Sequence, residues 1–160
     1  MEDLSNAERG SIIQSTNDMY SNPEIYYYER WLTAALQKDC RDHQIIVLTG
    51  ARQVGKSTLL AHAEPFRYGR SHTMDDFEVL DQATRAPEAL WSGTDHVVLD
   101  EVQKAPKLLQ AVKIAVDCNP GKYRFVLSGS ANLLLMKQVS ESLAGRAVYF
   151  ILDPMTLGEI

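Results

Sequence analysis

Short apolar runs alternate along this chain with longer stretches that have a helical apolar period. The apolar runs cover residues 44–49, 97–99, 123–127 and 147–152, and polar residues or glycine bound each of them. Short runs of this kind are typical of strands that are buried on both faces of a parallel sheet. A weaker strand is expected over residues 71–74.

The stretches between these runs predict helices, because they carry apolar residues at three- and four-residue steps or residues that favour a helix. The expected helices cover residues 24–38, 56–63, pieces of 77–91, 107–117 and 132–141. Asp75 and Asp76 precede Phe77, where an acidic side chain would cap a helix. Strands that alternate with helices form βαβ units. The predicted fold class is therefore α/β, a three-layer sandwich with a mostly parallel sheet of about five strands.

The two ends of the chain differ from this alternating pattern. Residues 1–23 are rich in Ser, Asn, Asp and Glu without an apolar period, and we expect a flexible leader there. Residues 24–153 contain the alternating elements and form the expected domain. Residues 154–160 look like the opening of a further element.

Composition narrows the class of protein. A chain of 160 residues with 45% hydrophobic and 23% charged residues suits one globular domain. The net charge is −5 and no block of Lys and Arg occurs, so charge does not indicate nucleic-acid binding. The apolar runs are too short to span a bilayer and no signal peptide is visible, which predicts a cytoplasmic protein without membrane contact.

The strongest chemical signal is a glycine-rich loop between the first predicted strand and the following helix. Its two glycines, Lys56 and Ser57 have the spacing of a phosphate-binding loop. Glycines let successive backbone N–H groups point inward and bind an anion, and Lys56 would reach the β- and γ-phosphates. The Ser57 hydroxyl would bind Mg²⁺, which prefers oxygen ligands. The residues expected to contact nucleotide are Gly50, Ala51, Arg52, Gln53, Val54, Gly55, Lys56, Ser57 and Thr58.

Two carboxylates follow the apolar strand at 97–99. Asp100 would hold Mg²⁺, usually through water, and Glu101 would polarise the attacking water. Two acids after a strand are, by themselves, more often a solvated loop or a helix cap. Together with the glycine loop they favour the metal and base roles, and an adjacent pair suits hydrolysis rather than transfer to a small acceptor.

Three further features have two interpretations each. Ser128 follows the strand at 123–127, where its hydroxyl would lie between the first and third strands and touch the γ-phosphate or the water; a polar turn is the alternative. Arg146 would stabilise transition-state charge, in its own site or a neighbour's, or would be an ordinary surface arginine. The aromatic residues at 26–28 and Trp31 would stack on a base or form a helical core face. The absence of an Asn-Lys-x-Asp motif after the loop favours adenine over guanine.

Several runs of this sequence resemble a family of prokaryotic AAA-type ATPases close to the archaeal ATPases. They are L-T-G-A-R-Q-V-G-K-S-T-L-L, M-D-D, V-V-L-D-E-V-Q, F-V-L-S-G-S-A-N-L-L-L and S-L-A-G-R-A-V-Y-F. The resemblance covers about Tyr26 to Ile160. It implies a P-loop NTPase fold of the RecA/AAA type, with Asp100 as the Walker B acid, Glu101 as the catalytic base and Ser128 or Ser130 at the sensor position. Family members commonly carry a further C-terminal domain, so residues 154–160 would be its beginning and the chain would be truncated.

These observations predict an ATPase domain that binds Mg-ATP and hydrolyses it slowly to ADP and phosphate. Its partners would be ATP and either an unknown protein or a second copy of the chain. A non-hydrolysing nucleotide-binding interaction module is the main alternative. A small-molecule kinase would need an Arg-rich lid, which is not seen between Lys56 and Asp100, and a DNA-dependent motor would need a basic stripe.

Overall fold

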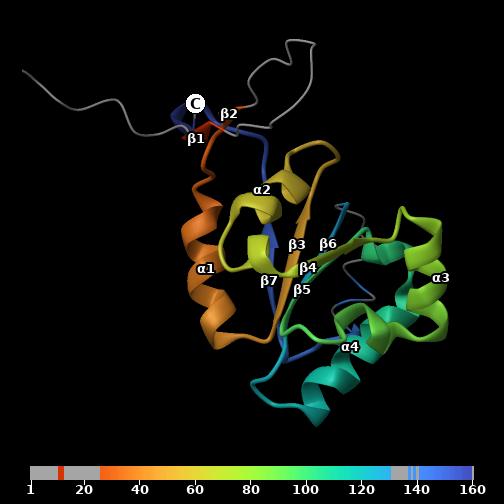
Figure 1. Cartoon of the computed structure of the whole chain (residues 1–160). Helices are drawn as coiled ribbons and strands as arrows, with labels where there is room; N and C mark the ends of the chain where they lie inside the picture. Colours follow the sequence, from red (N-terminus) through yellow and green to blue (C-terminus); the bar gives the residue numbers. More distant parts are fainter. Residues whose placement is uncertain (1–10, 13–25, 131–136, 138, 140, 160) are drawn as a thin grey trace, which may run out of the picture.

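Five parallel strands form the centre of the molecule (Figure 1). The computed structural model describes residues 11–12, 26–130, 137, 139 and 141–159. The strands are β3 (Ile45–Gly50), β4 (Arg70–Thr73), β5 (His96–Asp100), β6 (Arg124–Ser130) and β7 (Ala147–Ile151). They lie in the order β4-β5-β6-β3-β7, and every neighbouring pair is parallel. The predicted five-stranded parallel sheet is confirmed.

Helices cover both faces of this sheet. They are α1 (Leu32–Asp42), α2 (Lys56–His62), α3 (Phe77–Arg85) and α4 (Pro106–Cys118), with short 3-10 helices η1 (Phe66–Tyr68), η2 (Pro87–Trp91), η3 (Val102–Lys104) and η4 (Leu157–Glu159). Figure 1 shows α1 and α2 on one side of the sheet and α3 and α4 on the other. The predicted three-layer α/β sandwich is therefore confirmed.

The described residues form two apolar core clusters, one on each face of the sheet. Successive side chains of a strand point to opposite faces. Ile46 and Leu48 of β3 accordingly join the cluster under α1 and α2, whereas Ile45 and Val47 join the cluster under α3 and α4. All six residues of β3 are buried, which explains why this strand is a continuous apolar run rather than an alternating one.

The first predicted helix begins later than expected. Tyr26–Tyr27 form a short strand, β2, that pairs antiparallel with β1 (Ser11–Ile12), and α1 starts only at Leu32. The helical prediction was wrong for residues 26–31, because aromatic residues spaced as on a helix also suit extended backbone when a partner strand is present. Within the predicted leader at 1–23, the structure describes only β1.

Other predicted elements are found close to their expected places. The weak strand is β4, and the Asp76 side chain caps α3 by accepting hydrogen bonds from the backbone N–H groups of Glu78 at 2.8 Å and Val79 at 3.3 Å. Of the predicted helix at 132–141, only residues 137, 139 and 141 are described, and these are helical. Among the described residues no helix is long and apolar enough to cross a bilayer.

The parallel direction of the strands fixes where a site can form. The carboxyl ends of parallel strands meet at the same edge of a sheet, and ligands of α/β proteins bind there. Gly50 at the end of β3, Asp100 at the end of β5 and Ser130 at the end of β6 therefore lie along one edge. Residues that precede a strand lie at the opposite edge.

Candidate functional site

The loop at 51–55 joins the end of β3 to the start of α2. Gly50, just before the loop, and Gly55, at its end, must each be glycine for a different steric reason. A Cβ atom on Gly50 would lie 2.4 Å from the carbonyl oxygen of Leu152, so no larger residue fits. Gly55 has φ +93°, which side chains rarely allow. Gln53 also has positive φ, at 63°. The backbone therefore curls tightly between β3 and α2.

Lys56 lies within this curl. Its side chain is buried, and its ammonium group donates hydrogen bonds to the carbonyl oxygens of Gly50 at 3.1 Å and Ala51 at 2.9 Å. Burying a lysine is costly unless its charge is paired or hydrogen-bonded. The Lys56 ammonium group is thus held against the loop, where the sequence predicts that it contacts phosphate.

Asp100, at the end of β5, contacts side chains of α2 and of the neighbouring strand β6. Its Oδ2 accepts a hydrogen bond of 2.8 Å from the Ser57 hydroxyl, which is 43 residues away in the sequence. Its Oδ1 accepts from the Ser128 hydroxyl and, at 3.0 Å, from the backbone N–H of Glu101. Ser128 reaches Asp100 because β6 lies between β3 and β5. The structure thus brings together Ser57, Asp100 and Ser128, as the sequence predicts.

Glu101 lies beside this group and has an unexpected partner. Its backbone is in the left-handed region at φ 55°, a conformation that costs free energy in residues other than glycine and that is concentrated at functional sites. The Gln103 amide N–H₂ donates a hydrogen bond to Oε2 of Glu101 and lies 3.5 Å from the Ser130 hydroxyl. The other amide atom, Oε1, is buried without a hydrogen-bond partner among the described residues. Sequence reasoning did not assign Gln103 a role, although it belongs to the quoted D-E-V-Q run.

Arg146 lies away from the loop. It precedes β7, whose first residue pairs with Ile45, five residue steps of about 3.3 Å from Gly50. The Arg146 guanidinium forms a bidentate ion pair with Asp117, with Nε–Oδ1 at 2.6 Å and Nη2–Oδ2 at 3.0 Å. These hydrogen bonds lower the pKa of the Asp117 carboxyl. Because β7 runs parallel to β3, Arg146 lies at the edge of the sheet opposite the loop of its own chain. A role for Arg146 at a nucleotide, in its own site or a neighbour's, stays a prediction.

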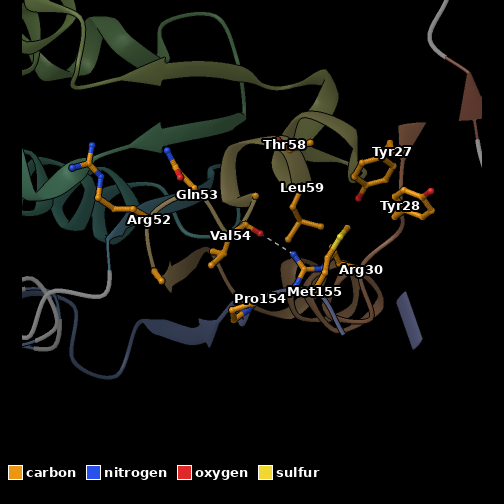
Figure 2. A pocket seen from close by; sticks show the side chains of 12 residues that line it. Tyr27, Tyr28, Arg30, Arg52, Gln53, Val54, Thr58, Leu59, Pro154 and Met155 are labelled. Atoms are coloured by element: carbon orange, nitrogen blue, oxygen red, sulfur yellow. Dashed lines mark hydrogen bonds between the residues drawn. The ribbon is translucent and has the colours of Figure 1, made fainter. Parts of the chain in front are cut away.

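A cavity of about 530 Å³ opens next to the loop (Figure 2). It is lined by Tyr27, Tyr28, Arg30, Ala51, Arg52, Gln53, Val54, Gly55, Thr58, Leu59, Pro154 and Met155. Tyr27 stacks on His62 with ring centroids 4.1 Å apart, and Tyr28 is partly exposed. Two of the aromatic residues considered for base stacking therefore line this cavity, and they do so from β2 and the segment before α1 rather than from a helix. Trp31 is 70% exposed and does not line the cavity.

Arg30 is a second residue that sequence reasoning missed. It is buried, and its guanidinium donates to the carbonyl oxygens of Val54 at 2.9 Å and Asp153 at 2.5 Å. Its Nε–H donates to Glu159 at 3.1 Å. Because these partners are far from Arg30 in the sequence, no local sequence pattern predicts the contacts.

A family model described as an AAA domain matches residues 42–160. The chain belongs to this AAA domain family. This AAA domain is therefore a nucleotide-binding, ATPase-like domain.

Two similar relatives are proteins named only as uncharacterised, one from Mycobacterium bovis and one from Mycobacterium tuberculosis. Each is 31% identical over 132 residues, which is 79% of this chain and 29% of the relative. The AAA domain thus spans less than a third of the length of these relatives. A solved structure, the P-loop NTPase domain of the Sigma-54 transport activator from E. coli, is 16% identical with a TM-score of 0.49, and the match covers 77% of this chain and 92% of that one.

Proposed function

We propose that this AAA domain binds Mg-ATP at the loop of residues 50–58 and hydrolyses it slowly to ADP and phosphate. One observation supports this proposal most strongly. The Ser57 hydroxyl, which directly follows the buried Lys56 in the sequence, lies 2.8 Å from the Asp100 carboxylate. These two residues are 43 positions apart in the sequence. A cation, a hydroxyl and a carboxylate at a curled loop form the set of groups that a metal-bound triphosphate requires.

The two ends of the nucleotide would occupy neighbouring places. The triphosphate would lie against the loop, where Lys56 would exchange its contacts with the Gly50 and Ala51 carbonyls for phosphate oxygens. The base would enter the adjoining cavity, whose volume of about 530 Å³ is typical of small-molecule sites. Tyr27 and Tyr28 offer aromatic surface there, which suits a flat base. Adenine is favoured because no guanine-reading motif follows the loop.

The residues present fit a Mg²⁺ ion. The Ser57 hydroxyl and the Asp100 carboxylate are oxygen ligands, and Mg²⁺ usually needs only one or two protein groups in addition to water and phosphate oxygens. Ser128 and the Glu101 N–H hold the other oxygen of Asp100, which keeps Oδ2 directed at Ser57. When bound, the ion would neutralise charge that develops on the phosphate oxygens.

Glu101 is the proposed general base for the attacking water. Its carboxylate directly follows Asp100 at the sheet edge, and the hydrogen bond from Gln103 holds it in one orientation. The Gln103 amide competes with water for the carboxylate, which would slow proton abstraction. Arg146 lies at the opposite edge of the sheet, so it adds no positive charge to the phosphates in the site of its own chain. Both features would make turnover slow until a protein partner or a second copy completes the site.

The test is a phosphate-release assay on the wild type, Glu101→Gln and Glu88→Gln. Glu88 is exposed on η2 and serves as the matched control. We expect Glu101→Gln to keep ATP binding and to lower phosphate release by about 100-fold or more, because a general base typically contributes that much. The Glu88 variant should match the wild type. Unchanged release by Glu101→Gln would move the base to another residue.

A second candidate is a nucleotide-binding interaction module that does not hydrolyse ATP. The Gln103–Glu101 hydrogen bond favours it, because this bond occupies the carboxylate that would activate water. In the same assay this candidate predicts ATP binding without phosphate release in the wild type. Replacing Gln103 by Leu separates the two candidates further, since a base released from Gln103 would raise hydrolysis only if the site is otherwise competent.

A further inference from the structure

Arg30 ties together three segments that are distant in the sequence. It lies between β2 and α1, and its side chain is only 4% exposed. Its guanidinium donates to Val54 in the glycine loop, 24 residues away, to Asp153, 123 residues away, and to Glu159, 129 residues away. Figure 2 shows the contact between Arg30 and the Val54 carbonyl at the wall of the cavity. One buried side chain thus connects the loop to the segment after β7.

Glu159 completes this connection. Its side chain is 6% exposed, and Oε1 accepts hydrogen bonds from Arg30 and, at 3.0 Å, from the backbone N–H of Trp31. Oε2 accepts from the backbone N–H of Thr156 at 2.9 Å and from its hydroxyl at 3.3 Å. The backbone N–H groups of Thr156 and Trp31, followed by Arg30, lower the pKa of Glu159 to about 2. The carboxylate is therefore charged at neutral pH and has a donor for each oxygen.

The contact with Val54 affects the geometry of the loop. A peptide unit is planar and trans, so its C=O and the following N–H point in opposite directions. Because the Val54 carbonyl is held toward Arg30, the Gly55 N–H is directed away from Arg30. Gly55 is also the residue at φ +93° that turns the chain into α2. Arg30 thus fixes the Val54–Gly55 peptide, one residue before Lys56 and its proposed phosphate contacts.

The segment at 153–159 touches the same site in a second way. Pro154 and Met155 line the cavity proposed for the base, while Asp153 and Glu159 on either side of them are held by Arg30. A ligand in the cavity would therefore contact a segment that is already tied to the loop.

We propose that Arg30 and Glu159 form a clasp that sets the geometry of the phosphate loop and couples nucleotide binding to the position of residues 153–159. The coupling half of this proposal rests on the proposed ATP site. Coupling between two sites is reciprocal in binding free energy. Any partner or following segment that pulls residues 153–159 away would therefore weaken ATP binding by some factor. Bound ATP would disfavour that displacement of residues 153–159 by the same factor. Arg30 acts here as a positioning residue.

The first experiment needs no nucleotide. Hydrogen exchange is measured for the wild type, Arg30→Met, Glu159→Gln and the control Arg85→Met, whose arginine forms an exposed ion pair with Asp81 at 2.9 Å. We expect both clasp variants to exchange the amides of residues 53–56 and Thr156 at least tenfold faster than the wild type, after correction for the change in global stability that the core amides of β6 report. The control should match the wild type. Glu159→Gln keeps one acceptor oxygen and serves if Arg30→Met fails to fold. Unchanged exchange in the loop would overturn the clasp.

The second experiment repeats the exchange with ATP and Mg²⁺ and measures ATP affinity by calorimetry. We expect ATP to slow exchange at Thr156 in the wild type, and Glu159→Gln to weaken ATP binding about tenfold. If ATP binds the wild type without protecting Thr156 and binds Glu159→Gln equally well, the coupling is wrong and the nucleotide site stands. If the wild type does not bind ATP, the proposed function and the coupling both fall, and the loop-setting role is decided by the first experiment alone.

Discussion

Arg30 and Arg146 are both paired with an acidic residue, but their surroundings differ. The Arg30–Glu159 pair is buried, with side chains 4% and 6% exposed, and it contacts the glycine loop. The Arg146–Asp117 pair has side chains 37% and 41% exposed and lies at the opposite edge of the sheet. Arg146 belongs to a run that resembles a known family, whereas Arg30 belongs to no motif that sequence reasoning used.

The difference shows that a residue's place relative to a parallel strand matters more than its motif. Arg146 directly precedes β7, so it must lie at the edge where β7 begins, and the loop lies where β3 ends. Arg30 reaches the loop because the segment before α1 passes the end of β3. An arginine that serves the nucleotide of its own chain has to come from a segment at that edge.

The largest expected difference between the two pairs concerns stability. Arg30→Met should lower the free energy of unfolding by about 3 kcal/mol, because it leaves Glu159 as a buried charge without its cation. Arg146→Met should change it little, since exposed ion pairs contribute little and are screened by salt. Urea denaturation of both variants and the wild type measures this. Equal losses would mean that burial does not distinguish the pairs.

A smaller difference is expected in acid. The pKa of Glu159 is lowered from 4.5 to about 2 in the folded state, so its stabilising contribution is complete above its ordinary pKa and is lost as pH falls toward 2. Glu159→Gln should therefore lose less stability than the wild type between pH 5 and about 2.5. Asp117→Asn should flatten the curve less than Glu159→Gln does, because the Asp117 carboxyl is exposed and solvent screens its ion pair with Arg146. Urea midpoints across this pH range give the answer, and parallel curves for the wild type and Glu159→Gln would contradict it.

The fold was largely predictable because its signals are local. The continuous apolar run of β3 predicted a strand buried on both faces, and Asp76 predicted the start of α3. The proximity of Ser57 and Asp100 was predictable, because the loop that leads to Ser57 leaves the end of β3 and Asp100 ends β5 at the same edge of the sheet. The contact between Arg30 and Glu159 was not predictable, because these residues are more than 120 positions apart in the sequence and leave no periodic pattern. The strand at Tyr26–Tyr27 was missed because its partner, β1, is a pair of residues in a polar stretch.

The loop of residues 50–58 around Lys56 is proposed to bind the triphosphate of ATP together with Mg²⁺. Titration calorimetry with ATP, with and without Mg²⁺, tests it most directly on the wild type, Lys56→Ala and the control Lys107→Ala, which removes an exposed lysine of α4. We expect the wild type and the control to bind ATP, with weaker binding when Mg²⁺ is absent, and Lys56→Ala to show no detectable binding. Equal ATP affinity in Lys56→Ala and the wild type would contradict it.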